Sequence, residues 1–281
     1  MVYVLSLIYN TYKYVYFYHI IMQSLLNAFP NTLNTRFNPQ LRDEFVQKHA
    51  QSLPAKSKVL DVSSGAKPYQ KFFSNCNYIS HEFEGNKNIV DTFRGENGKK
   101  SHDIYSPIDA IPIPNDEFDF ILCTEVFEHI PEPIKAMEEF VRLCKPGGKI
   151  LITAPFTSGI HQEPYHFYSG FSPFFYNYLK EKFHLNITAF KSQGNLFLLQ
   201  NQEIQRCLGY THPTIQQNSA LLNTYNQIKQ FLHSYTLHMS KAVEPQLSPY
   251  DSPEKMTHSF HNINHFTIGY CVLFEKPITT P

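Results

Sequence analysis

The sequence predicts an α/β fold, a doubly wound and mostly parallel sheet. Short apolar runs bounded by turn residues recur along the chain, and segments with helical periodicity lie between them. Such runs are typical of strands buried on both faces, and their alternation with helices is typical of a parallel sheet. The length of 281 residues and the hydrophobic content of 42% are enough for one full-sized core with appended segments.

The first predicted elements are a short charged helix and three strands. Residues 40–50 are expected to form the helix. The run 58–62 (KVLDV) predicts a buried strand, because it is stopped by the turn signal Ser63-Ser64-Gly65. Residues 76–80 predict a second strand, and the apolar run 118–124 (FDFILCT) predicts a third.

The next elements alternate helix and strand. Apolar side chains in 133–144 are spaced three and four apart, which predicts an amphipathic helix that ends at the Lys-Pro-Gly-Gly stop of 145–148. Residues 149–154 (KILITA) predict the following strand. Ser172 and Pro173 predict a helix start with a capping Ser. The last two predicted strands are 185–190 and 265–274.

The segment between these two strands is longer than a connection requires. It is mostly polar, but one stretch has apolar positions at alternating intervals of four and three residues. These positions are Leu221, Tyr225, Ile228, Leu232, Tyr235 and Met239. The stripe predicts a helix with one apolar face. We expect this helix to lie across the domain; a homodimer seam and a lid over the substrate are the alternatives.

The amino terminus is aromatic and has no acidic residue before Asp43. Residues 1–22 contain seven Tyr or Phe, and Asn10, Lys13 and His19 make the segment too polar for a spanning helix. We expect an aromatic helix packed on its own domain. A peripheral membrane anchor is one alternative, and a true start at Met22 is another.

Charge and cysteine content argue against a nucleic-acid-binding protein and against a cysteine-based metal or redox site. Lys plus Arg and Asp plus Glu both number 24, and no basic block occurs, so we expect no nucleic-acid partner. The five cysteines are far apart and none has Cys-x-x-Cys spacing, so no metal or redox site is predicted. Scattered cysteines fit a reducing compartment, and we therefore expect a cytoplasmic protein.

Two features near the first strands suit a nucleotide-like ligand. Small residues follow Asp61 at the end of the first strand, and they allow close approach of the backbone to a ligand. Glu82 follows the second strand, where an acid can bind both hydroxyls of a ribose. An ordinary tight turn is the alternative interpretation.

The segments 117–130 (EFDFILCTEVFEHI) and 143–156 (LCKPGGKILITAPF) resemble the class I S-adenosylmethionine-dependent methyltransferases, in particular the type 11 methyltransferase domain. The resemblance implies a seven-stranded Rossmann-like sheet and S-adenosyl-L-methionine as cofactor. The stretch 161–168 (HQEPYHFY) is similar to a segment of bacterial members associated with cell-surface glycan or small-metabolite pathways. The expected organisation is an extension at 1–41, a core at 42–200, a helical insertion at 201–262, and the last strand and tail at 263–281.

The resemblance also implies roles for individual residues. The cofactor-binding residues it implies are Asp61, Ser63, Gly65, Tyr69, Glu82, Asp109, Thr124 and Glu125. The chain departs from the family pattern at three positions. Ser63 and Lys67 stand where glycine is usual, and Pro107 aligns with the usual acid after the third strand.

Methyl transfer to oxygen also requires removal of a proton, which suits His near neutral pH. His129 and His161 are the predicted catalytic residues, with a structural hydrogen bond and a solvent-exposed loop position as the respective alternatives. Tyr165 and Tyr168 are predicted to bind the substrate, unless they pack against the FSPFFY segment. The expected acceptor is a hydroxyl, or similar nucleophile, of a small molecule or glycan. The alternative function is a catalytically inactive binding or scaffold protein.

Overall fold

The computed structural model describes residues 37–83, 102–209, 216–243 and 267–278. These residues form two compact units: the described parts of Arg36–Gly194 and Pro249–Pro281, here called the sheet unit, and the described part of Asn195–Ser248, here called the helix pair. The predicted boundary at residue 200 falls inside a helix of the second unit. Predictions for residues 1–22 lie outside the described residues.

The sheet unit contains a seven-stranded sheet of order β3-β2-β1-β4-β5-β7-β6. Its strands are β1 (Lys58–Val62), β2 (Asn77–Glu82), β3 (Ile104–Tyr105), β4 (Phe118–Thr124), β5 (Cys144–Pro155), β6 (Asn186–Ser192) and β7 (Gly269–Glu275). Strands β1 to β5 pair in parallel, whereas β7 is antiparallel to both β5 and β6. This mixed sheet confirms the predicted Rossmann-like methyltransferase fold, and β3 is the one strand that the apolar runs did not indicate.

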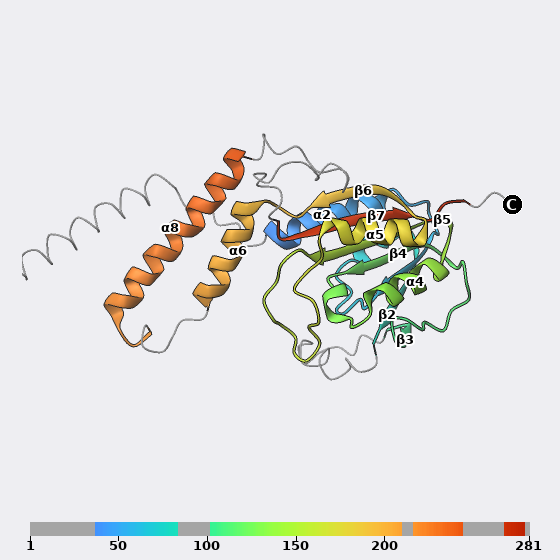
Figure 1. Cartoon of the computed structure of the whole chain (residues 1–281), viewed down its shortest axis with the longest axis horizontal. Coiled ribbons are helices and arrows are strands. Elements are labelled where there is room, and N and C mark those ends of the chain that lie inside the picture. Colours follow the sequence, from blue (N-terminus) through green and yellow to red (C-terminus); the bar gives the residue numbers. More distant parts are fainter. Residues whose placement is uncertain (1–36, 84–101, 210–215, 244–266, 279–281) are drawn as a thin grey trace, which may run out of the picture. The chain divides into compact units, whose positions relative to one another are not determined.

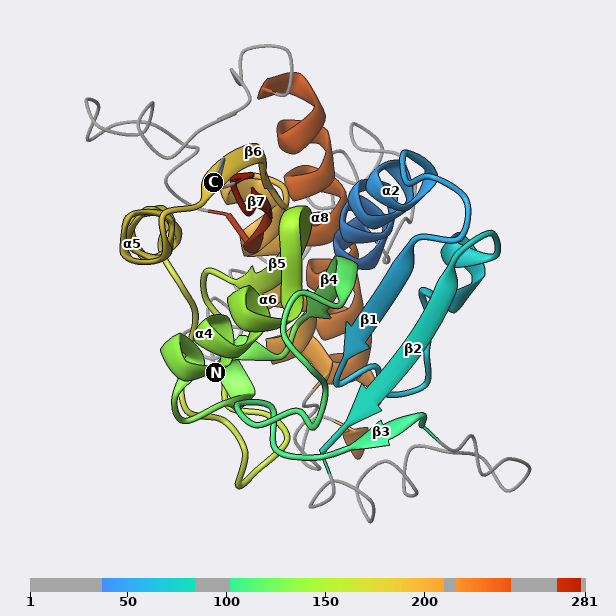
Figure 2. The ribbon, with the colours of Figure 1, turned by 90° about the vertical axis from the view of Figure 1, so that its right-hand side faces the viewer.

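Helices cover both faces of this sheet (Figure 2). They are α2 (Phe37–Gln51), α4 (Pro133–Leu143) and α5 (Pro173–Phe183), with short 3-10 turns η1 (Gln70–Phe73) and η3 (Phe127–His129). Phe45 and Val46 of α2 pack with Phe120 and Leu122 of β4 in one apolar cluster. Alternate residues of the same strand face a second cluster with α4 and α5, because successive side chains of a strand point to opposite faces.

Most predicted boundaries in the sheet unit are confirmed within a few residues. β5 is longer than predicted, because the Lys-Pro-Gly-Gly segment continues into the strand instead of ending in a separate turn. Ser172 precedes α5 as predicted, but its side chain makes no capping hydrogen bond. The helix start therefore depends on Pro173 at the first position.

The helix pair consists of α6 (Leu196–Gly209) and α8 (Ser219–Val243), which pack against each other (Figure 1). Helix α8 confirms the predicted helix, but the predicted apolar stripe is not its buried face. Leu221 is 49% exposed, and Ile228 is 37% exposed. The buried side chains of α8 are His233, Ser234, Thr236, Leu237 and Ser240, most of them polar. None of the described helices has a stretch long and apolar enough to span a bilayer.

Candidate active site

The turn after β1 has the backbone conformation that a close approach requires. Ser63 and Gly65 both have a φ of 51°, in the left-handed region. A side chain is strained there, which explains why glycine is usual at the position of Ser63. A Cβ atom built on Gly65 would have no neighbour within 4 Å, so this turn faces open space.

Glu82 ends β2 beside this turn and is almost completely buried. The backbone N–H of Gly65 donates to its Oε2 at 3.0 Å, and the N–H of Phe83 donates to its Oε1 at 3.0 Å. An ionised carboxylate has about four acceptor sites, so two backbone bonds leave capacity for further hydroxyl donors.

A cavity of about 460 Å³ opens beside these residues. Its volume lies within the range of pockets that hold small molecules. The predicted site residues among its lining are Ser63, Gly65, Glu82, Asp109, Glu125, His129 and Tyr165. The lining also includes residues to which the sequence analysis gave no binding role, chiefly Phe83, Pro107, Ile108, Val126 and Ile130. These are mainly apolar, and from the sequence alone they resemble ordinary core or turn positions.

Five predicted site residues do not line the cavity: Asp61, Tyr69, Thr124, His161 and Tyr168. Burial, reinforced by the charge of Glu82 and opposed by a hydrogen bond from Tyr78, raises the pKa of Asp61 to about 7. The Tyr69 hydroxyl is buried and accepts a hydrogen bond from Arg42 Nε at 2.7 Å. The Tyr168 hydroxyl donates to the Pro131 carbonyl at 2.9 Å. These three side chains are therefore engaged in contacts within the protein.

Glu125, directly after β4, is fixed from two sides. Its Oε1 accepts a hydrogen bond from the Thr153 hydroxyl at 2.9 Å. Its Oε2 lies 3.3 Å from Arg42 Nη1, so α2 contributes a charge at the carboxyl end of the sheet. Arg42 belongs to the predicted charged helix, but nothing in its local sequence distinguishes it from a solvent-exposed basic residue.

The loop between β5 and α5 is held against the end of β4. The Phe171 N–H donates to the Pro155 carbonyl at 2.8 Å, which closes the base of the loop. A Cβ atom on Gly170 would lie 2.2 Å from the Phe156 carbonyl oxygen, so only glycine allows this approach. The Phe167 N–H donates to the Glu128 carbonyl at 2.8 Å. The loop thereby brings residues 161–168 beside η3.

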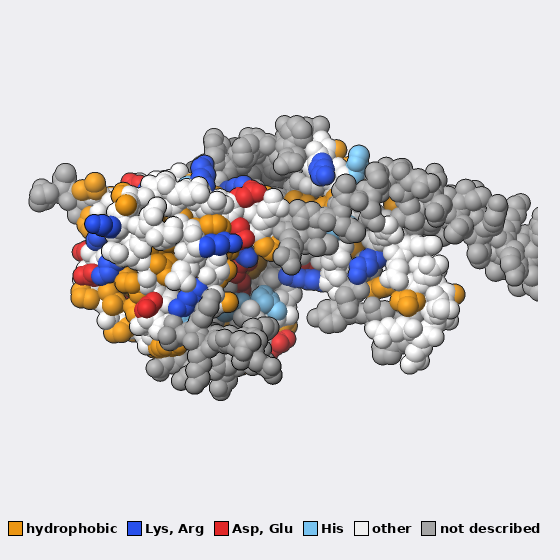
Figure 3. Space-filling view, turned by 180° about the vertical axis from the view of Figure 1, so that it is seen from behind, with side chains coloured by type: hydrophobic (Ala, Val, Ile, Leu, Met, Phe, Trp, Pro, Cys, Tyr) orange, Lys and Arg blue, Asp and Glu red, His pale blue; other side chains and the backbone are white. Residues whose placement is uncertain are grey.

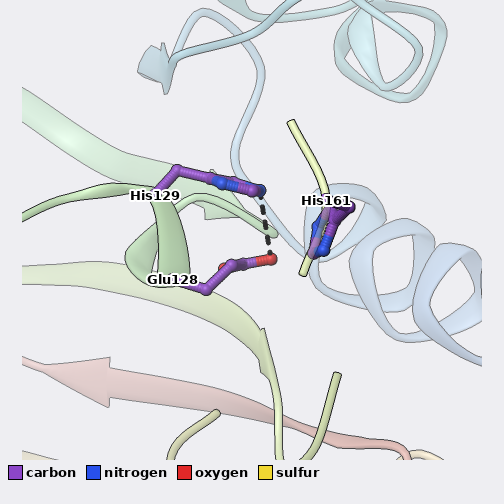
Figure 4. A group of neighbouring side chains, drawn as sticks. All are labelled: Glu128, His129 and His161. Atoms are coloured by element: carbon purple, nitrogen blue, oxygen red, sulfur yellow. Dashed lines mark ion pairs between the residues drawn. The ribbon is translucent and has the colours of Figure 1, made fainter. Parts of the chain in front are cut away.

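Three imidazoles gather where this loop meets η3. The His161 ring centroid lies 4.8 Å from both those of His129 and His166. Burial holds the pKa of His129 below its ordinary value, against the hydrogen bond to the Tyr165 carbonyl, and so favours the neutral ring. Glu128 is buried beside them, and burial reinforced by Glu125 raises its pKa to about 8. Figure 4 shows Glu128, His129 and His161 directed toward a common point.

Charges of both signs are interspersed on one face of the sheet unit. On the face drawn in Figure 3, blue Lys and Arg side chains alternate with red Asp and Glu side chains. The formal net charge of the chain is zero. The absence of a nucleic-acid partner stays a prediction.

Comparisons with known proteins give one family and several distant structures. A sequence model of the methyltransferase domain family matches residues 35–208, more than half of the chain. None of the curated proteins matches the chain.

Three of the similar solved structures have TM-scores of 0.47, 0.42 and 0.41, respectively. A candidate sarcosine dimethylglycine methyltransferase from Galdieria sulphuraria is 18% identical, and the match covers 86% of each chain. An S-adenosylmethionine-dependent methyltransferase from Aquifex aeolicus is 20% identical over 61% of this chain and 92% of its own. Phosphoethanolamine N-methyltransferase 2 from Haemonchus contortus, in complex with S-adenosyl-L-methionine, is 12% identical over 84% of this chain and 52% of its own.

Proposed function

This chain belongs to the methyltransferase domain family, and from that premise we propose that it transfers a methyl group from S-adenosyl-L-methionine to a hydroxyl of a small molecule or glycan. The observation that carries the proposal is a single cavity lined by the Gly65 turn, Glu82 and His129. These groups come from the ends of different strands, where ligands of doubly wound sheets bind.

The cofactor end of the cavity is the wall that contains Gly65 and Glu82. The remaining acceptor sites of Glu82 suit the two hydroxyls of a ribose. Ile108 and Pro107 provide an apolar surface next to Asp109, which suits the adenine ring. The residues present therefore fit the cofactor, although Pro107 replaces the usual acid.

The acceptor end is the wall that contains His129 and Tyr165. When bound, S-adenosyl-L-methionine supplies a sulfonium methyl: the acceptor oxygen bonds to the methyl carbon while the carbon–sulfur electron pair returns to sulfur. The wall must orient the acceptor and help its hydroxyl to lose a proton. The neutral ring of His129 has a nitrogen lone pair for this purpose. Phe83 and Tyr165, with ring centroids 6.4 Å apart, flank the same opening.

Calorimetric titration with S-adenosyl-L-methionine tests the cofactor site. Replacing Glu82 with alanine removes charge-assisted hydrogen bonds of about 1.5–3 kcal/mol each. We expect the affinity of Glu82→Ala to fall at least about tenfold, and Glu82→Gln to lose part of it with little change in melting temperature. Glu138→Ala, at an exposed position of α4, is the matched control. Unchanged affinity in Glu82→Ala would remove Glu82 from the site, and no binding by the natural protein would favour the scaffold alternative.

A further inference from the structure

The side chains of Glu128, His129 and His161 form a potential ligand set beside the cavity (Figure 4). One ligand atom from each lies within 4.8 Å of the other two. Two imidazoles and one carboxylate, with an open position, are a donor set of catalytic zinc sites. Ligand atoms of a tetrahedral zinc ion lie about 3.3–3.5 Å apart, so binding requires His161 to move inward by roughly 1–1.5 Å. His161 is half-buried on a loop, where such a movement needs no change in the sheet.

Both imidazoles are oriented by backbone carbonyl groups. His129 Nδ1 is hydrogen-bonded to the Tyr165 carbonyl, and His161 Nδ1 lies 2.9 Å from the Gly159 carbonyl. A carbonyl oxygen can only accept, so each Nδ1 carries the proton and, in the neutral ring, each Nε2 keeps its lone pair. Metal-binding histidines are usually held in this way, with the second ring N–H donated to a carbonyl or carboxylate.

The carboxylate of Glu128 lacks the partners that a buried charge needs. Glu128 is 1% exposed, and no described residue donates a hydrogen bond to its Oε2. Its Oε1 lies 3.7 Å from Nε2 of His129, the nitrogen that has the lone pair. When Glu128 is ionised, two acceptors face each other across this gap, and a buried charge without a donor is costly. A cation between them would interact favourably with both.

We propose that Glu128, His129 and His161 bind one divalent transition-metal ion, of which Zn²⁺ is the natural probe. Imidazole nitrogen and carboxylate oxygen suit such ions better than Mg²⁺ or Ca²⁺, which prefer oxygen ligands alone. Binding of the ion would displace the proton of Glu128, and neutral imidazoles with an ionised Glu128 would then leave the site with one unit of positive charge. This proposal departs from the expectation of no metal site, which depended on cysteine spacing and did not consider a His and Glu ligand set.

The role of the ion in catalysis rests on the proposed function. An open position on the ion would take the acceptor oxygen and lower the pKa of its hydroxyl, so that the proton leaves to solvent before the methyl carbon is attacked. The lone pair of His129 then acts as a ligand. In the metal-free protein the same lone pair is the proton acceptor.

Calorimetric titration of the tag-free full chain with Zn²⁺ alone, after dialysis against a chelator, tests the site. We expect one ion per chain in the natural protein. Loss of an outer-shell partner already costs about 10–100-fold in metal affinity. We therefore expect His161→Ala and Glu128→Gln each to weaken the binding of Zn²⁺ by at least tenfold. His161→Ala changes a loop position and Glu128→Gln preserves size, so both should keep the melting temperature of the metal-free protein.

Two control variants make the result specific. His184→Asn changes a histidine at the end of α5 that has a φ of 52°, which Asn tolerates, and it should bind Zn²⁺ as the natural protein does. His166→Ala should also retain binding, because its Nε2 lies 3.2 Å from the Ser158 hydroxyl. Equal losses in His184→Asn, or unchanged affinity in His161→Ala and Glu128→Gln, would overturn the proposal.

Titration with S-adenosyl-L-methionine separates this proposal from the proposed function. If the cofactor binds and Zn²⁺ does not, the metal site is wrong and methyl transfer stands. If Zn²⁺ binds with the expected loss in the variants and the cofactor does not bind, the proposed function fails while the metal site is supported.

Discussion

The sheet unit and the helix pair are held together by different kinds of contact. In the sheet unit the largest buried side chains are aromatic, and most of them are apolar, such as Phe118, Phe120 and Phe127, all with no exposed surface. Between α6 and α8 the most deeply buried side chains are polar: Asn201 donates to the Thr236 hydroxyl at 2.6 Å and to the His233 carbonyl at 3.1 Å. The sheet unit is therefore stabilised mainly by the burial of apolar surface, whereas hydrogen bonds between side chains contribute more to the packing of α6 on α8.

The largest expected effect lies in the sheet unit. Phe120 contacts Phe73, with ring centroids 5.8 Å apart, inside the cluster that joins α2 to the sheet. Phe120→Ala should lower the free energy of unfolding by about 3–5 kcal/mol, because it removes buried area and leaves a cavity. Denaturant unfolding measures this, with Phe174→Ala at a 62% exposed position as the control. A cost below about 1 kcal/mol would show that the sheet unit does not depend on apolar packing.

The helix pair should respond less to a comparable change. Asn201→Leu removes the donor to the Thr236 hydroxyl and the contact with the His233 ring, at a cost of about 1–3 kcal/mol. The His233 carbonyl keeps the hydrogen bond that the Thr236 hydroxyl donates to it. The hydrogen-exchange rates of the backbone amides of α6 measure this loss of local stability. The double variant Asn201→Leu/Thr236→Val removes both the donor and the acceptor of the hydrogen bond between these two side chains, and it should recover most of the lost stability. A double variant no more stable than Asn201→Leu would indicate that apolar packing, not hydrogen bonding, joins the helices.

The smallest expected effect is a pH response specific to the helix pair. Burial, followed by the charge of Lys229, lowers the pKa of His233. The folded state then binds this proton less readily than the unfolded state, so the stability of α6 and α8 should fall as the pH decreases from about 6.5, the ordinary pKa of His, toward the lower pKa of the folded state. His233→Gln should flatten this dependence in hydrogen exchange corrected for intrinsic rates. An unchanged slope would mean that His233 does not titrate differently in the two states.

Part of the candidate active site could be predicted from the sequence. Gly65, Glu82, Glu125 and His129 follow predicted strands, and the carboxyl ends of parallel strands meet at one edge. The sequence did not predict the remaining residues that line the cavity, because Phe83, Pro107 and Ile108 are of types that also occur in ordinary core and turn segments. Glu128 lies in the segment 117–130 that carries the family resemblance, but its burial and the missing donor at its Oε2 became visible only in the folded structure.

The sequence by itself determined the strands of the sheet unit other than β3, because runs such as 58–62 and 118–124 are apolar enough to be buried on both faces. It also determined that α8 is a helix, but its apolar stripe suggested the wrong buried face. Tertiary structure alone decided that Asn201 and His233 are buried and that His161 joins Glu128 and His129. Most buried polar side chains have a hydrogen-bond partner, and in the helix pair such partners come from distant parts of the chain, as Asn201 and Thr236 do.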